Sequence, residues 1–66
     1  MDNREKILNC ALELFHARGY DAVGVQEIAE TAGVTKPTLY YYFGNKRGLL
    51  EALLSREYAQ FRSEVF

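Results

Sequence analysis

Apolar residues recur at intervals of three and four along most of the chain, a spacing that predicts helices and no strand. The first stripe comprises Ile7, Leu8, Ala11, Leu12, Leu14 and Phe15. It predicts a helix over residues 3–18, with Asp2 and Glu5 as a capping pair at its start. Gly19 follows the last apolar turn, as is usual where a helix ends.

Two short helices are predicted in the middle of the chain, over residues 25–31 and about 36–42. Gly33 lies between them, and a glycine readily adopts the left-handed conformation that such a turn requires. Thr35 suits the N-cap of the later helix, and Pro37 suits its first turn, where no backbone donor is needed.

A fourth, longer helix is predicted from about residue 46 toward the end of the chain, with Asn45 as its N-cap. Its apolar stripe comprises Leu49, Leu50, Leu53, Leu54, Tyr58, Phe61 and Val65. The connection that precedes the second helix, residues 20–24, begins with Tyr20, which we expect in the core.

The two short helices and their glycine turn predict a helix-turn-helix over about residues 25–43. Ala29 supplies the small side chain that a close helix crossing requires. The apolar residues expected to hold the unit to the core are Ile28, Ala32, Val34 and Leu39. The fold class is therefore all-α: a small helical bundle, one domain over residues 1–66, with a longer fourth helix.

The third helix has an outward face of unusual chemistry. With Leu39 in the core, the helical period turns outward Lys36, Pro37, Tyr40 and Tyr41. Lysine reaches guanine acceptors, proline touches a thymine methyl, and tyrosine hydroxyls bond phosphate oxygens. Asn45 and Lys46 add free backbone N–H groups and positive charge at the start of the fourth helix. This surface predicts contact with double-stranded DNA.

The overall charge argues mildly against DNA binding, because the 66-residue chain carries a net charge of −1 and has a pI near 5.7. The distribution matters more than the sum. Between Thr31 and Leu50 the basic residues are Lys36, Lys46 and Arg47, and that stretch contains no acidic residue. One surface of a slightly acidic domain is therefore expected to be positive.

The sequence offers no set of residues suited to catalysis or metal binding. Cys10 and His16 do not share a helix face, and one cysteine permits no intrachain disulfide. We expect Cys10 at the core boundary, and Glu27 and Glu30 on a solvated face. No cofactor, metal or enzymatic activity is expected. With no membrane-spanning run and a mixed-charge N-terminus, we expect a cytoplasmic location.

An ordered set of short motifs resembles the N-terminal domain of tetracycline-repressor-like (TetR family) regulators, over about residues 4–54. The motifs are Gly19-Tyr20, Ile28-Ala29, Ala32-Gly33-Val34-Thr35, Thr38-Leu39-Tyr40-Tyr41-Tyr42-Phe43, Asn45-Lys46 and Leu49-Leu50. The resemblance implies groove contacts from Lys36, Pro37, Thr38 and Tyr41 and phosphate contacts from Tyr40, Tyr42 and Lys46. Gln26 would reach the backbone or a flanking base. With Thr35, these residues form the expected DNA-binding set.

The resemblance also implies partners for the intact protein. A larger helical C-terminal domain, absent from this chain, would form a homodimer on a palindromic operator and bind a small-molecule inducer. One departure concerns Gly24 and Val25, where the family often carries a hydroxyl that caps the second helix and touches phosphate. That contact is not expected here.

Two alternatives remain open at this point. Tyr42 shares a face with Leu39, so it fits a core position as well as a DNA contact. The apolar face of the fourth helix, which extends through Tyr58, Phe61, Val65 and Phe66, fits an interaction surface for protein as well as a frayed tail. A helical protein-interaction module is therefore the competing hypothesis for function.

Overall fold

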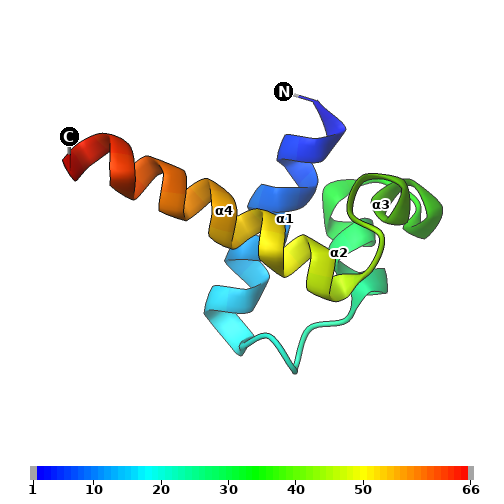
Figure 1. The fold of residues 1–66 in the computed structure, drawn as a ribbon. Coiled ribbons are helices and arrows are strands. Elements are labelled where there is room, and N and C mark those ends of the chain that lie inside the picture. Colours follow the sequence, from blue (N-terminus) through cyan, green and yellow to red (C-terminus); the bar gives the residue numbers. More distant parts are fainter. Residues whose placement is uncertain (1, 66) are drawn as a thin grey trace.

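The computed structural model describes the backbone of residues 2–65 and the side chains of residues 2–56. It contains the helices α1 (Asn3–Arg18), α2 (Val25–Ala32), α3 (Lys36–Phe43) and α4 (Lys46–Val65), shown in Figure 1. No strand occurs within residues 2–65. The predicted all-α fold is confirmed, and α2 and α3 each extend one residue further than the sequence pattern indicates.

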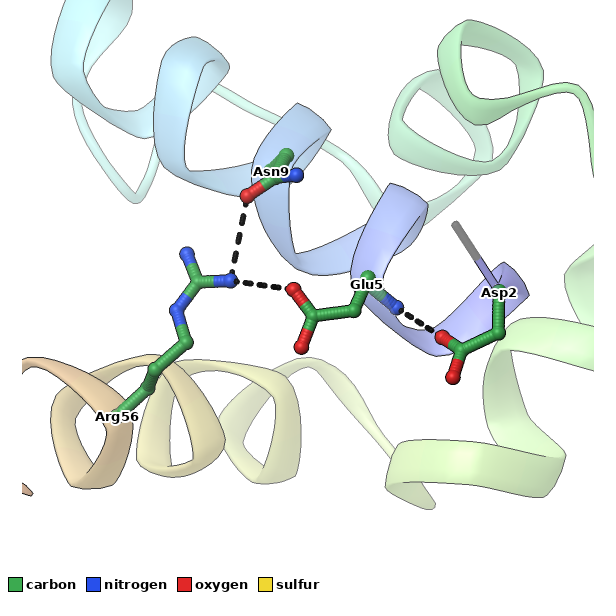
Figure 2. A network of polar contacts seen from close by, with 4 residues as sticks. All are labelled: Asp2, Glu5, Asn9 and Arg56. Atoms are coloured by element: carbon green, nitrogen blue, oxygen red, sulfur yellow. Dashed lines mark hydrogen bonds and ion pairs between the residues drawn. The ribbon is translucent and has the colours of Figure 1, made fainter.

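The start of α1 is capped differently from the expected reciprocal pair. The backbone N–H of Glu5 donates to Asp2 Oδ1 at 2.8 Å, so the N-cap itself is confirmed. The Glu5 carboxylate instead accepts from Arg56 of α4, at 3.3 Å from Nη1 to Oε2. The same Nη1 lies 3.2 Å from Asn9 Oδ1 (Figure 2). Glu5 therefore joins two helices instead of closing a capping box.

The connection between α1 and α2 is held by Arg18. Its guanidinium donates to the Ala22 carbonyl at 3.0 Å and to the Glu27 carboxylate on α2. The Glu27 side chain remains 38% exposed, as expected of a solvated face, and its ion pair with Arg18 also ties the start of α2 to the end of α1. Gly19 opens this connection with φ 88°, and its N–H donates to the Phe15 carbonyl at 2.8 Å.

The turn between α2 and α3 has the geometry that the sequence predicts. Gly33 ends α2 with φ 75° and ψ 28°, in the left-handed region. The Gly33 N–H donates to the Glu30 carbonyl at 3.2 Å, and the Val34 N–H donates to the Ala29 carbonyl at 3.0 Å. Ala29 is completely buried, which confirms the need for a small residue there.

The core gathers side chains from all the helices and from the first connection. Its buried members are Ile7, Leu8, Ala11, Val23, Ile28, Ala29, Ala32, Leu39, Leu49 and Leu53. Val23 was not expected there, because it belongs to a connection and carries no helical period. It is only 1% exposed, since Arg18 folds this connection back over the core.

Two expectations about the core need correction, and one is confirmed. Tyr20 is half-buried and does not belong to the buried set. Val34, which is also half-buried, packs against the core as expected. Leu54 is 58% exposed, because Leu49 and Leu53 face the core and the next residue turns about 100° away from that face. The predicted stripe residues Tyr58, Phe61, Val65 and Phe66 lie outside the described side chains. No helix within residues 2–65 combines the length and apolarity needed to cross a bilayer.

Candidate nucleic-acid interface

The first turn of α3 is fixed by hydroxyl groups. Thr35 Oγ1 accepts from the backbone N–H of Thr38 at 3.3 Å and lies 2.9 Å from Thr38 Oγ1. Thr35 is thus the N-cap that the sequence predicts, and Pro37 occupies the first turn. The Thr38 hydroxyl is half-buried and already has a partner, so this threonine is less open to solvent than Lys36 or Pro37.

The outward face of α3 carries the side chains that the helical period places there. Lys36 and Pro37 are exposed, as are Tyr40 at 39% and Tyr41 at 84%. The Lys36 Nζ lies 5.9 Å from the centroid of the Tyr40 ring. Leu39 is completely buried on the opposite side. The part of α3 available to a ligand is therefore aromatic and cationic.

Tyr42 lies at the margin of this face. Its side chain is 37% exposed, so it does not belong to the core beside Leu39. Its ring lies edge-on to Tyr41, with centroids 5.3 Å apart, and 6.1 Å from the ring of Phe43. Phe43 is half-buried against the core. Tyr42 thus keeps part of its surface accessible while its ring is held by aromatic neighbours.

The first turn of α4 adjoins the end of α3. Asn45 Oδ1 accepts from the Gly48 N–H at 2.7 Å, which confirms the predicted N-cap. Lys46 is half-buried, and its Nζ lies 4.2 Å above the Tyr20 ring. This cation–π contact places positive charge beside the N-terminal end of the α4 dipole, and no ion pair links Lys46 to an acidic residue within 2–56. An anion is the ligand that such a terminus favours.

The start of α2 contributes the remaining expected residue. Gln26 is exposed in the first turn of α2. Gly24 precedes that turn as an N-cap with no side-chain hydrogen bond, as its lack of a hydroxyl dictates. The expected DNA-binding set thus comes from α2, α3 and the start of α4, which are consecutive around the helix-turn-helix (Figure 1).

Comparison with known proteins identifies the family of this chain. The family model described as bacterial regulatory proteins, tetR family, matches residues 7–53, which include the helix-turn-helix and the start of α4. The chain belongs to the TetR family. The resemblance drawn from the sequence motifs is thereby confirmed, and the chain is the DNA-binding domain of a TetR-like transcriptional regulator.

Several characterised TetR-family members are similar to this chain. The class D tetracycline repressor protein of Escherichia coli is 43% identical over 51 residues, or 77% of this chain and 23% of the repressor. The HTH-type transcriptional activator FasR of Mycolicibacterium smegmatis is 47% identical over 55 residues, or 83% and 25%. The E. coli repressor ComR is 37% identical over 62 residues, or 94% and 30%. No solved structure matches the chain.

These relatives are transcriptional regulators and not enzymes, and this chain spans about a quarter of their length. Within the described residues no group of three or more potential ligands is placed to hold a metal ion. Cys10 is half-buried, and burial, assisted by the Glu13 carboxylate, raises the pKa of its thiol. A boundary position for Cys10 agrees with the expectation from sequence.

Two further residues lie next to the expected DNA-binding set. Tyr20 provides the ring beneath Lys46. Arg4 of α1 places its guanidinium carbon 5.5 Å from the centroid of the Phe43 ring, at the end of α3. Neither contact has a signal in the sequence, because each joins segments that only the tertiary fold brings together.

Proposed function

We propose that α3 of this TetR-family domain enters the major groove of double-stranded DNA and reads bases there, while the start of α4 binds a flanking phosphate. The observation that carries the proposal is the outward face of α3. Its exposed residues are one lysine, one proline and three tyrosines, and no acidic residue occurs between Thr31 and Leu50. A surface of this composition favours binding to a polyanion such as DNA over simple exposure to solvent.

The base-reading role is assigned to the first half of α3. Lys36 and Pro37 are exposed in the first turn, where a recognition helix approaches base edges. Tyr41, the most exposed tyrosine, extends the same face. Thr38 is the last residue assigned to base reading. Its hydroxyl already bonds Thr35, so its methyl group and its remaining hydrogen-bonding capacity would contact the bases.

The phosphate-binding role is assigned to the residues that flank this face. Tyr40 and Tyr42 are each partly exposed, so their hydroxyls would be available to backbone phosphate oxygens. Lys46, which is held over Tyr20, supplies charge at the start of α4. Gln26 on α2 would reach the backbone or a flanking base. These contacts position the domain, and the α3 contacts provide the sequence preference.

For the intact protein we propose a homodimer that binds a palindromic operator in the cytoplasm through two such domains. A C-terminal domain beyond this chain would hold the dimer and bind a small-molecule inducer that releases DNA. The similar proteins include repressors and an activator. We favour repression, since most of the relatives named above are repressors.

The experiment that tests the proposal measures DNA affinity at several salt concentrations with random-sequence duplexes and then with selected sites. Lys46→Ala should weaken binding to all duplexes alike and reduce the log–log salt slope by about 0.9. Lys36→Ala should relax the preference at one base pair, which corresponds to roughly 1–3 kcal/mol of discrimination. Lys6→Ala, at an exposed position of α1, is the matched control for loss of one charge.

The result that would refute this assignment is unchanged DNA affinity in both the Lys36 and the Lys46 variant. Amide shifts in an NMR titration provide an independent readout. On addition of duplex they should cluster at Gln26, residues 36–42 and residues 45–46. Shifts confined to the later part of α4 would instead favour protein binding.

A second candidate function rests on the exposure of Leu54. At 58% exposed on α4, this leucine leaves an apolar surface uncovered within the described residues. A protein-interaction role for α4 predicts that Leu54→Asp or Phe61→Asp abolishes self-association while DNA affinity is unchanged. Sedimentation of the variants separates this role from DNA binding, and both surfaces are compatible with one dimeric regulator.

A further inference from the structure

Of the seven lysines and arginines within residues 2–56, six fall into two groups with different partners, and Lys6 belongs to neither group. One group forms ion pairs with glutamates and comprises Arg18, Arg47 and Arg56. The other group lies over aromatic rings and comprises Arg4, Lys36 and Lys46. A carboxylate neutralises a cation and occupies its donors, whereas a ring holds the cation and leaves donors available to another acceptor. The second group is therefore prepared to bind an anion.

Two members of this second group, Lys36 and Lys46, already belong to the proposed DNA surface. The third, Arg4, lies in the first turn of α1 and outside the residues that the family model matches. Its side chain is exposed, and no ion pair links it to any residue within 2–56. Its position relative to α3 decides whether it shares the function of the other two.

Arg4 stands at the end of a row of aromatic rings on α3. Its guanidinium carbon lies 5.5 Å from the centroid of the Phe43 ring. The Phe43 ring lies 6.1 Å from that of Tyr42, which in turn lies 5.3 Å from that of Tyr41. This row runs from the core edge to the most exposed tyrosine of the DNA-facing surface. The first turn of α1 thus adjoins the end of α3 (Figure 1).

The acidic side chains near Arg4 are engaged elsewhere. Asp2 Oδ1 accepts the Glu5 N–H as the N-cap of α1. The Glu5 carboxylate pairs with Arg56 on α4, at 3.3 Å, in the network of Figure 2. Both carboxylates therefore have structural partners, and the charge of Arg4 is left for a ligand outside the domain.

We propose that Arg4 is a further DNA contact, a guanidinium on α1 that binds a backbone phosphate beside the end of α3. The inference rests on the proposed function of α3 and extends the DNA-binding surface to a third segment of the chain. A phosphate accepts two parallel N–H donors from a guanidinium, and the Phe43 ring restricts the motion of the arginine before DNA arrives. The contact would add affinity on every sequence and no base preference.

The test measures the affinity of the chain for a random-sequence duplex between 50 and 200 mM salt, with Arg4→Gln, Arg4→Lys and Lys6→Gln. Loss of one phosphate contact reduces the slope of log binding constant against log salt concentration by about 0.9. Over this fourfold range of salt, the wild type should therefore lose roughly three- to fourfold more affinity than Arg4→Gln. Arg4→Lys keeps the charge and should keep the wild-type slope. Lys6→Gln removes one positive charge two residues along α1, about 200° around the helix. This variant should also keep the wild-type slope.

Two results would overturn the inference: a wild-type slope for Arg4→Gln, or an equal reduction for Lys6→Gln, which would mean that net charge alone matters. Lys46→Ala in the same series separates this inference from the proposed function. If Lys46→Ala lowers the slope and Arg4→Gln does not, only the Arg4 contact is wrong. If neither lowers it, the phosphate contact proposed for Lys46 at the start of α4 is wrong as well.

Discussion

Gly48 occupies a position on α4 where no larger residue fits. A Cβ atom built on Gly48 would lie 2.0 Å from the backbone carbonyl oxygen of Phe43, which ends α3. We expect Gly48→Ala to lower the free energy of unfolding by about 1–3 kcal/mol, because the gain in helix propensity is smaller than the cost of displacing the backbone. Urea denaturation followed by circular dichroism would measure the change.

The neighbouring residue Arg47 provides the control for Gly48→Ala. Its side chain is 84% exposed and forms an exposed ion pair with Glu51, at 3.9 Å. Arg47→Ala should therefore change stability by no more than roughly 0.5 kcal/mol. Equal stabilities of Gly48→Ala and wild type would show that the α3–α4 junction relaxes freely.

At the scale of single elements, α2 is the helix with the weakest start. Its N-cap, Gly24, has φ −95° and ψ 157°, a conformation open to any L residue, and space for a side chain. Gly24→Ser should raise the free energy of unfolding by roughly 0.5–1 kcal/mol, since the hydroxyl can accept an N–H of the first turn and the unfolded chain loses freedom. Thermal unfolding would register it.

Gly24→Ala separates the two contributions to that gain. Alanine restricts the unfolded chain as serine does but offers no acceptor, so Gly24→Ala should be about 1 kcal/mol less stable than Gly24→Ser. If both variants have the same Tm, the hydroxyl introduced by Gly24→Ser does not accept a hydrogen bond from the first turn of α2. The other short helix, α3, already has such a cap in Thr35, which explains why its start is well defined.

At the scale of the whole molecule, Arg56 joins the two ends of the domain. Its Nη1 contacts Glu5 Oε2 at 3.3 Å and Asn9 Oδ1 at 3.2 Å, so α4 is tied to the start of α1 (Figure 2). Arg56→Met keeps the apolar stem and removes these bonds. We expect a loss of about 1 kcal/mol, which lowers the Tm of a domain this small by roughly 4–8 °C.

A double-mutant cycle tests whether the loss belongs to this pair. Glu5→Gln combined with Arg56→Met should cost less than the sum of the two single changes, because the same interaction is removed twice. Arg47→Met removes a more exposed pair and should leave the Tm nearly unchanged. Additive single changes would mean that the Glu5–Arg56 pair does not contribute and that Arg56 acts through Asn9 or through its apolar stem.

The sequence alone determined the helices, the turn and the outward face of α3, because these depend on neighbours within a few residues. Gly33 marks the left-handed turn, Thr35 and Asn45 mark helix starts, and Leu39 fixes which side of α3 is buried. Local rules of this kind need no knowledge of the remaining chain. The family resemblance followed from the same short motifs.

Only the tertiary structure decided which distant side chains meet. Val23 lies in the core because Arg18 folds the first connection back, and Leu54 lies outside because α4 turns its other face inward. Lys46 lies over Tyr20, and Arg4 lies over Phe43, across spans that no helical period relates. The physical reason is that packing selects these contacts from many that the sequence permits, so the rings that hold Arg4 and Lys46 were identified only in the assembled fold.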